Sequence, residues 1–273
     1  MDSGAFSGSS MLDVEFAQLS DPGKVRDHNE DCVGYCLPQT PKEARAYGWI
    51  FALADGVGGQ DRGEVASRSA IETLTSGLHQ KRAEESTSHL LQSVMQTANQ
   101  RVHELAAATD SSMCTTTVAC ALRGNIVTIA HVGDSRCYLI RRDGAVLLTR
   151  DHTLVNEQVT LGLLSDAEAA VSESRHLLSR SLGANKTVDI DIVERQIVPG
   201  DVLLLSSDGL HASVTSAEIG SIVANFHDLK EAAKQLVSLA RDKDGSDNIS
   251  VQLIRVRNVE RMGVYRGRPY KLH

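Results

Sequence analysis

The chain has 273 residues, of which 41% are hydrophobic and 23% charged, and its formal net charge is -7. This composition allows one large buried core, and the acidic balance disfavours a nucleic-acid-binding surface. No stretch approaches the ~18 uninterrupted apolar residues of a membrane-spanning helix, and the first ten residues lack the features of an export signal, so we expect no membrane association. Five cysteines without a C-x-x-C pair indicate reduced thiols and a cytoplasmic location.

The spacing of apolar residues predicts alternating groups of strands and helices. In chain order, it predicts strands at 15–19 and 49–54, helices at 62–78 and 88–105, strands at 116–122, 126–132, 136–140, 146–149, 188–193 and 202–205, two helices beginning at the capping boxes of Thr215 and Asp228, and a strand at 249–256. The turns among the four central strands are short, so we expect these strands to form an antiparallel meander.

These elements predict a single domain over residues 13–257. Residues 1–12 are expected to form a disordered N-terminal tail, and residues 258–273 a basic, solvated C-terminal tail. Residues 152–175 lack strand character and are predicted to be a flap-like segment with one short helix at the capping box of Ser165. Because βαβ alternation is absent, the order predicts an α+β fold, a four-layer αββα sandwich in which two packed, mainly antiparallel sheets are flanked by helices.

Acidic residues stand where buried strands are predicted to end. Asp55 follows the apolar run at 49–54, Asp208 follows the run at 202–205, and a glycine follows each carboxylate directly. A carboxylate near an apolar strand end loses hydration, which costs several kcal/mol unless a cation or hydrogen-bond donors compensate. Further acidic residues occur in turns at Glu30, Asp31, Asp134 and Asp247. The pattern favours a site for a hard metal ion.

Five short motifs occur in one order along the chain. They are Arg26-Asp27-His28-Asn29-Glu30-Asp31, Ala54-Asp55-Gly56-Val57-Gly58-Gly59, Gly133-Asp134-Ser135-Arg136, Ser206-Ser207-Asp208-Gly209 and Asp247-Asn248. Each alone is a weak signal, because Asp-Gly pairs are usually turns. Together they resemble the metal-dependent protein phosphatase family (PPM, protein phosphatase 2C-type), and the compact form, spanning residues 14 to 256, is similar to its bacterial serine/threonine phosphatases.

The resemblance implies a metal ligand set made of oxygen atoms. It implies that Asp55 bridges two metal ions, that Glu30 and the carbonyl of Gly56 bind one of them, and that Asp208 and Asp247 bind the other. Oxygen ligands suit Mn²⁺ or Mg²⁺, and the lack of clustered histidine and cysteine ligands argues against zinc. The implied cofactors are therefore two divalent ions, Mn²⁺ or Mg²⁺.

Other positions carry implied roles around these ions. Asp31 matches an outer position that reaches metal-bound water, and Asp134 matches a ligand of a third, weaker metal site. Arg26 matches the arginine that grips the substrate phosphate, a task suited to a planar bidentate donor. Where animal members often have a histidine that serves as general acid, this chain has Val57, so His152 is the candidate proton donor by resemblance.

The function implied is that of a metal-dependent serine/threonine phosphoprotein phosphatase that hydrolyses phosphomonoesters. A phosphate dianion repels an attacking hydroxide, and two metal ions ~3.5–4 Å apart neutralise charge and aim a bridging hydroxide directly at phosphorus. The implied partners are phosphoserine and phosphothreonine proteins and a cognate serine/threonine kinase, with the enzyme acting as a monomer.

Three alternatives remain open from the sequence. The first is a catalytically silent pseudophosphatase that binds phosphoproteins, which metal binding without turnover would support. The second is a phosphatase of the same superfamily that acts on a sigma-factor regulator, which a panel of phosphoproteins would identify. The third is a metal-dependent phosphodiesterase or nuclease, which the acidic balance disfavours and diester substrates would test.

Overall fold

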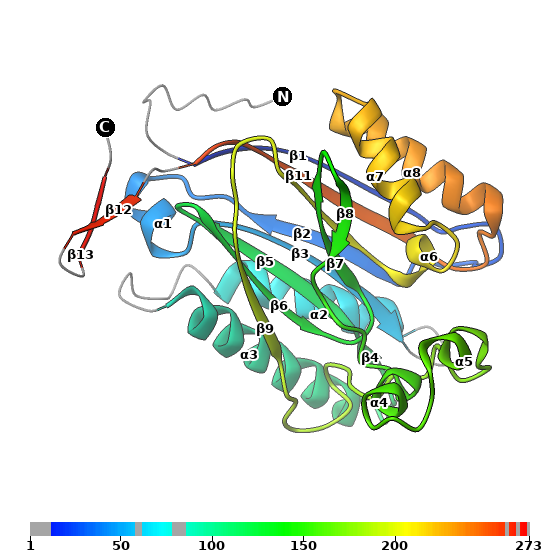
Figure 1. The fold of residues 1–273 in the computed structure, drawn as a ribbon. Helices are drawn as coiled ribbons and strands as arrows, with labels where there is room; N and C mark the ends of the chain where they lie inside the picture. Colours follow the sequence, from blue (N-terminus) through cyan, green and yellow to red (C-terminus); the bar gives the residue numbers. More distant parts are fainter. Residues whose placement is uncertain (1–11, 58–61, 78–85, 260–261, 266–267, 272–273) are drawn as a thin grey trace.

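Two antiparallel sheets stack face to face in the computed structural model, which describes residues 12–57, 62–77, 86–259, 262–265 and 268–271 (Figure 1). The strands are β1 (Asp13–Asp21), β2 (Asp31–Cys36), β3 (Trp49–Val57), β4 (Cys114–Thr115), β5 (Thr117–Arg123), β6 (Ile126–Val132), β7 (Arg136–Arg141), β8 (Gly144–Leu147), β9 (Asp191–Gln196), β10 (Val202–Ser206), β11 (Ile249–Asn258), β12 (Met262–Tyr265) and β13 (Arg268–Lys271). One sheet has the order β1-β11-β10-β7-β8, and the other has the order β2-β3-β5-β6-β9 with β4 paired to β3.

Helices lie around the two sheets. They are α1 (Pro41–Ala46), α2 (Gly63–Ser76), α3 (Thr87–Ala108), α4 (Leu154–Thr160), α5 (Asp166–Val171), α6 (Asp208–His211), α7 (Ser216–Asn225) and α8 (Leu229–Lys243). Figure 1 shows α2 and α3 on one side of the sandwich and α7 and α8 on the other. The short helices α4, α5 and α6 lie at the end where β3 stops.

The hydrophobic core is divided among three layers. Between the sheets, Phe51 and Cys120 of one sheet pack with Leu205 and Ile254 of the other. A second cluster joins the β3 sheet to α2 and α3, and a third joins the β11 sheet to α7 and α8. Burial on both faces explains why β3 and β10 have continuous apolar runs rather than alternating ones. The predicted α+β sandwich of four layers, αββα, is confirmed.

Local signals in the sequence set several helix starts correctly. Thr215 begins α7 with a capping box in which its side chain accepts from the Glu218 amide and the Glu218 carboxylate returns to the Thr215 amide. Ser165 and Glu168 form the same box at α5. Asp228 caps α8. Each cap provides partners for amides that the first helical turn leaves without acceptors.

The predicted four-stranded meander is wrong in one connection. β5 pairs with β6 and β7 pairs with β8, but β6 and β7 lie in different sheets. The chain crosses between the sheets at residues 133–135, where Gly133 has φ of +99°. A short loop alone therefore did not imply pairing, because a glycine in the left-handed region turned the chain away from its neighbour.

The sequence analysis also missed several elements. It gave no strand at β2, no helix at α1 or α6, and one helix instead of two within the flap-like segment. The expected solvated tail at 258–273 contains β12 and β13, which pair as a hairpin. Of the predicted N-terminal tail, residues 1–11 lie outside the described residues, and Leu12 is buried in the core. No helix in the described part of the chain is long and apolar enough to cross a membrane.

Candidate active site

One edge of the sandwich gathers the ends of four strands. β2 and β3 are antiparallel, so the start of β2 lies beside the end of β3, and Asp31 stands directly opposite Asp55. β10 and β11 are also antiparallel, which places Asp208, after β10, near Asp247, before β11. The Ser207 hydroxyl donates to the Asp31 carboxylate across 2.8 Å and so joins the two sheets. Residues far apart in the sequence therefore meet at this edge.

Glu30 and the carbonyl of Gly56 lie close together against Gly63. A methyl group placed on Gly63 would stand 2.7 Å from the Glu30 carboxylate oxygen Oε1 and 2.8 Å from the Gly56 carbonyl oxygen. The Gly56 amide also donates to the Glu30 carbonyl across 3.1 Å. Glycine at position 63 leaves room for both oxygens, so the structure brings together the two groups predicted to bind one metal ion.

Burial and mutual charge repulsion raise the pKa values of the carboxyl groups at this edge. Burial is the main cause, and it raises the pKa of Asp31 to about 7 and that of Asp55 well above its ordinary value. The negative charges of Asp208 and Asp247 add to the effect on both groups. Burial and the charge of Asp247 likewise raise the pKa of Asp208, which is hydrogen-bonded to Asp55. Asp31 Oδ1 and Asp208 Oδ1 are buried without a hydrogen-bond partner.

Arg26 lies at the exposed rim of this cluster. Its NH2 group donates to Asp247 Oδ2 across 2.7 Å, and its side chain is 49% exposed. Burial lowers its pKa, but the charges of Asp247, Glu30 and Asp208 raise it more, so the guanidinium remains charged. An exposed guanidinium beside buried carboxylates is placed to contact an anion that enters from solvent.

Asp134 occupies the turn where the chain crosses between sheets. Its side chain is buried, with 7% of the residue exposed. Burial is again the main cause that raises its pKa, to about 8, and the charges of Asp208 and Asp151 contribute. The adjacent Ser135 hydroxyl lies 2.6 Å from the hydroxyl of Thr116, which accepts from the Asp55 amide across 3.2 Å. Thr116 thus connects the Asp134 turn to the end of β3.

His152 is buried beside the turn at Gly133. The residue is 4% exposed, and its ring nitrogens face the Gly133 amide, 3.1 Å away, and Asp191 Oδ2, 3.3 Å away. Burial, with the charges of His131 and Arg180, lowers its pKa to about 4 against the opposing effect of Asp191. The role of His152 in proton transfer stays a prediction.

Asn248 holds the loop that carries the first motif, a role that the sequence analysis did not assign. Its Oδ1 accepts from the Glu30 amide across 2.8 Å, and its Nδ2 donates to the carbonyls of Pro22 and His28 across 3.1 and 3.0 Å. The residue is buried. The position of Asn248 directly after Asp247 in the fifth motif was the one signal of a role for it in the sequence. Only the fold shows that Asn248 reaches the first motif. Gly58 and Gly59 of the second motif lie outside the described residues.

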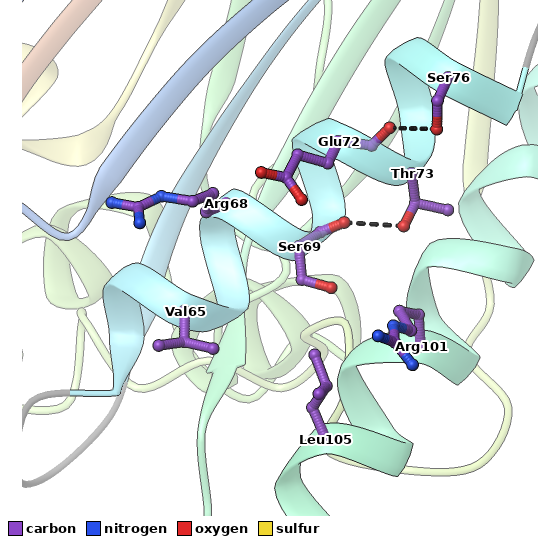
Figure 2. A pocket seen from close by; sticks show the side chains of 8 residues that line it. All are labelled: Val65, Arg68, Ser69, Glu72, Thr73, Ser76, Arg101 and Leu105. Carbon is purple, nitrogen blue, oxygen red and sulfur yellow. Dashed lines mark hydrogen bonds between the residues drawn. The ribbon is translucent and has the colours of Figure 1, made fainter.

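A separate groove of about 350 Å³ lies between α2 and α3 (Figure 2). It is lined by Val65, Arg68, Ser69, Glu72, Thr73, Ser76, Arg101 and Leu105. The hydroxyls of Thr73 and Ser76 donate to carbonyls of their own helix. None of the lining residues belongs to the acidic cluster, so the cluster and not this groove is the candidate active site.

The residues at the acidic edge fit a pair of hard cations. Four carboxyl groups with raised pKa values converge there, and two of their oxygens are buried without partners. Such a cluster is unfavourable by itself, because like charges repel and the ionised groups lose hydration. Divalent cations relieve both effects, and a donor set made only of oxygen suits Mg²⁺ or Mn²⁺.

Comparisons with known proteins agree with this site. A model of the protein phosphatase 2C family matches residues 39–253. The serine/threonine phosphatase stp of Listeria innocua is 34% identical over 249 residues, which cover 89% of this chain and 96% of the relative. Protein phosphatase PhpP of Streptococcus pneumoniae is 32% identical over 250 residues, covering 88% and 97%. The solved catalytic domain of the phosphatase PstP, in complex with two manganese ions, superimposes with a TM-score of 0.77 at 30% identity, covering 91% of this chain and all of that one.

The fold, the acidic edge and these relatives define a protein-serine/threonine phosphatase, a hydrolase of phosphoric monoesters. The chain belongs to the protein phosphatase 2C family. The resemblance inferred from the five motifs is therefore confirmed, and the pseudophosphatase alternative finds no support among the relatives.

Proposed function

We propose that this phosphatase is metal-dependent and releases phosphate from phosphoserine and phosphothreonine by direct attack on phosphorus, without a phosphoenzyme intermediate. The observation that carries the proposal is the convergence of buried carboxyl groups, of which Asp31 and Asp208 each have one buried oxygen without a hydrogen-bond partner. The chemistry that two bound divalent ions would supply is a hydroxide nucleophile at neutral pH and neutralisation of the phosphoryl charge. The PstP structure with two manganese ions supports this assignment for a relative.

Within this proposal, the chain's own residues hold and orient the reactants. Asp55 stands opposite Asp31 in the strand pairing, precedes Gly56 directly and is within reach of the charges of Asp208 and Asp247, so we assign it the position shared by both ions. Glu30 and the Gly56 carbonyl form one ligand group, and Asp208 and Asp247 form the other. Ser207 donates to one carboxylate oxygen of Asp31, and the other oxygen, which is buried without a hydrogen-bond partner, would be available to the ions or their water.

Arg26 is assigned to bind the substrate phosphate. Its guanidinium is exposed at the rim and held by Asp247, so it is oriented before substrate arrives. A bidentate contact with two phosphoryl oxygens would orient the phosphorus toward the cluster. We assign Asp134 to a third, weaker ion, because its buried carboxyl faces the charge of Asp208.

Three further proposals concern the cellular setting. The substrates are phosphoproteins, so a serine/threonine kinase must supply them. The complete ligand set lies within one chain, which supports action as a monomer. All five cysteines are free, which supports a cytoplasmic location.

Phosphate release from a phosphothreonine peptide tests the proposal. Turnover should require Mn²⁺ and should disappear with a chelator and in Asp208→Ala, while the control Asp228→Ala, which alters only the cap of α8, should retain it. A folded wild-type protein that binds Mn²⁺ but releases no phosphate from peptide or aryl phosphate would refute enzymatic turnover. Phosphate found transiently on a side chain would refute direct attack.

A further inference from the structure

Four ionisable side chains form a cluster outside the predicted ligand set. Strand pairing sets His131 of β6 opposite Asp191 of β9. His152, the first residue of the flap-like segment, and Arg180, five residues after its last, contact Asp191, and the Arg180 guanidinium donates to Asp191 Oδ1 across 3.0 Å. His131 and His152 are almost fully buried. The residue roles proposed above use none of these four groups, so their arrangement needs its own explanation.

His152 makes two hydrogen bonds to a single residue of the neighbouring turn. The His152 amide donates to the Gly133 carbonyl across 3.0 Å, and the Gly133 amide donates to His152 Nδ1 across 3.1 Å. Because a backbone amide can only donate, Nδ1 must carry the lone pair, and the ring proton therefore lies on Nε2. Nε2 faces the Asp191 carboxylate at 3.3 Å, which accepts this proton in a hydrogen bond.

The surroundings of His152 restrict its ring to this orientation. His131 stacks on it with ring centroids 4.7 Å apart and an angle of 21° between the planes. His131 is itself fixed, because its Nε2 lies 2.9 Å from the Arg150 carbonyl. Burial lowers the pKa of both rings, so they stack as neutral groups without charge repulsion.

A metal ion bound by His131, His152 and Asp191 is a competing explanation, since ligand atoms of the three lie within 4.8 Å of one another. Two features oppose it. The lone pairs of stacked rings run nearly parallel and do not converge on one ion, and His152 Nε2 already carries a proton. The Arg180 guanidinium, 3.5 Å from that nitrogen, adds a positive charge.

We infer that His152 is a positioning residue that clamps the Gly133–Asp134 turn and so holds the Asp134 carboxyl in the acidic cluster. Thr116 restrains the same turn from the opposite side through Ser135. The His152 carbonyl also accepts from the Ser179 amide, four residues after the flap-like segment, across 2.9 Å. The contacts of His152 thus connect the chain on both sides of this segment to the turn. The inference rests on the proposed function only in assigning a metal ion to Asp134.

Substitutions that retain one ring contact at a time test the clamp. His152→Asn keeps an acceptor at the position of Nδ1, and His152→Gln keeps a donor at the position of Nε2, whereas His152→Ala keeps neither. The control His103→Ala removes a histidine whose Nδ1 also contacts one glycine, the Gly183 carbonyl at 3.0 Å. Mn²⁺ binding is measured by electron paramagnetic resonance of the free ion, and Asp134→Ala identifies the binding step that depends on Asp134.

We expect His152→Ala and His152→Gln to weaken that binding step by about 10- to 100-fold, as is typical when a group that orients a ligand is lost. His152→Asn and His103→Ala should bind Mn²⁺ as the wild type does. Turnover of a phosphothreonine peptide and of p-nitrophenyl phosphate should fall by the same factor in His152→Ala, because a positioning role does not depend on the leaving group.

Two results would overturn the inference. One is unchanged Mn²⁺ binding in His152→Ala, with loss of turnover confined to the phosphothreonine peptide. The leaving group of this peptide must be protonated, so that result would identify His152 as a proton donor. The other is a binding step in Asp134→Ala identical to that of the wild type, since no ion then depends on the turn. Absence of turnover in the wild type would refute the proposed function instead, and the Mn²⁺ titration would still decide the clamp.

Discussion

Replacing Asp134 with asparagine should stabilise the metal-free protein while it weakens metal binding. In the folded chain burial raises the pKa of this carboxyl to about 8 from an ordinary value of 3.8. A raised folded-state pKa means that the folded state holds the proton more tightly, so the free energy of unfolding falls as the pH rises from 3.8 to about 8. The contribution of Asp134 to the stability of the metal-free wild type is therefore least favourable at neutral and alkaline pH.

The size of this effect follows from the same values. At pH 7.5 the rise corresponds to about 5 kcal/mol, at 1.36 kcal/mol for each pH unit. Asparagine also loses hydration when buried, and water entering the open site reduces the electrostatic cost. We therefore expect a net gain on the order of 1–3 kcal/mol for Asp134→Asn. For a domain of this size that gain raises the melting temperature by roughly 2–10 °C.

Thermal unfolding at pH 7.5 with a chelator, and then with Mn²⁺ at millimolar concentration, measures this directly. With the chelator Asp134→Asn should melt above the wild type, and Mn²⁺ should reduce or reverse the order because a bound ion stabilises the folded wild type more. Asp151→Asn is the matched control, because Asp151 is paired with Arg136 at 2.6 Å and its loss should lower stability in both conditions. A metal-free Asp134→Asn protein that melts below the wild type would refute the electrostatic argument.

Three further predictions concern the same edge of the sandwich. Mn²⁺ affinity, measured by calorimetry, should rise between pH 6 and pH 8.5, because Asp31 and Asp134 must lose protons whose pKa values are raised to about 7 and about 8; an affinity independent of pH would contradict this. Asn248→Ala should lower the free energy of unfolding by about 2–4 kcal/mol in urea and reduce turnover, because the Glu30 amide and two carbonyls lose their partner. Gly133→Ala should lower the free energy of unfolding by about 2 kcal/mol or more in the same assay, because φ is +99° and the added carbon would lie 2.6 Å from the Thr116 side chain. Gly124→Ala should lower it less, because φ at Gly124 is also positive but the added carbon would meet no atom within 4 Å.

The sequence predicted the layers of the fold because burial leaves a direct trace in the apolar pattern. The continuous runs of β3 and β10 and the helical spacing of α2, α3 and α8 are visible without a structure. The crossing between β6 and β7 left no such trace, because its cause is a backbone angle at Gly133. β2 was missed because it has only six residues. Gly34 and two cysteines among them interrupt the apolar pattern by which a strand is recognised.

For the site, local residues revealed candidate ligands but not the groups that hold them. Asp55 and Asp208 stand out because each ends an apolar run, which is a property of neighbouring residues. Asn248 reaches Glu30 across 218 sequence positions, and Thr116 reaches Asp55 across 61, so nothing near either residue indicates the contact. For His152, a histidine near a motif suggested proton transfer, which stays a prediction, whereas its burial and its contact with the Gly133 amide are visible only in the fold.

The residues that hold the acidic edge in place leave some of its carboxylate oxygens without hydrogen-bond partners. Ser207 binds one oxygen of Asp31 and leaves the other without a partner, and Thr116 holds the backbone of Asp55 rather than its carboxyl group. His152 likewise binds the backbone of Gly133 beside Asp134. These contacts restrain the acidic residues, while the lone pairs of Asp31 Oδ1 and Asp208 Oδ1 stay without hydrogen-bond partners. If donors had satisfied those lone pairs, the metal-free protein would be more stable, but the edge would have less affinity for cations, so the stability deficit predicted above follows from the same design that makes the site bind metal.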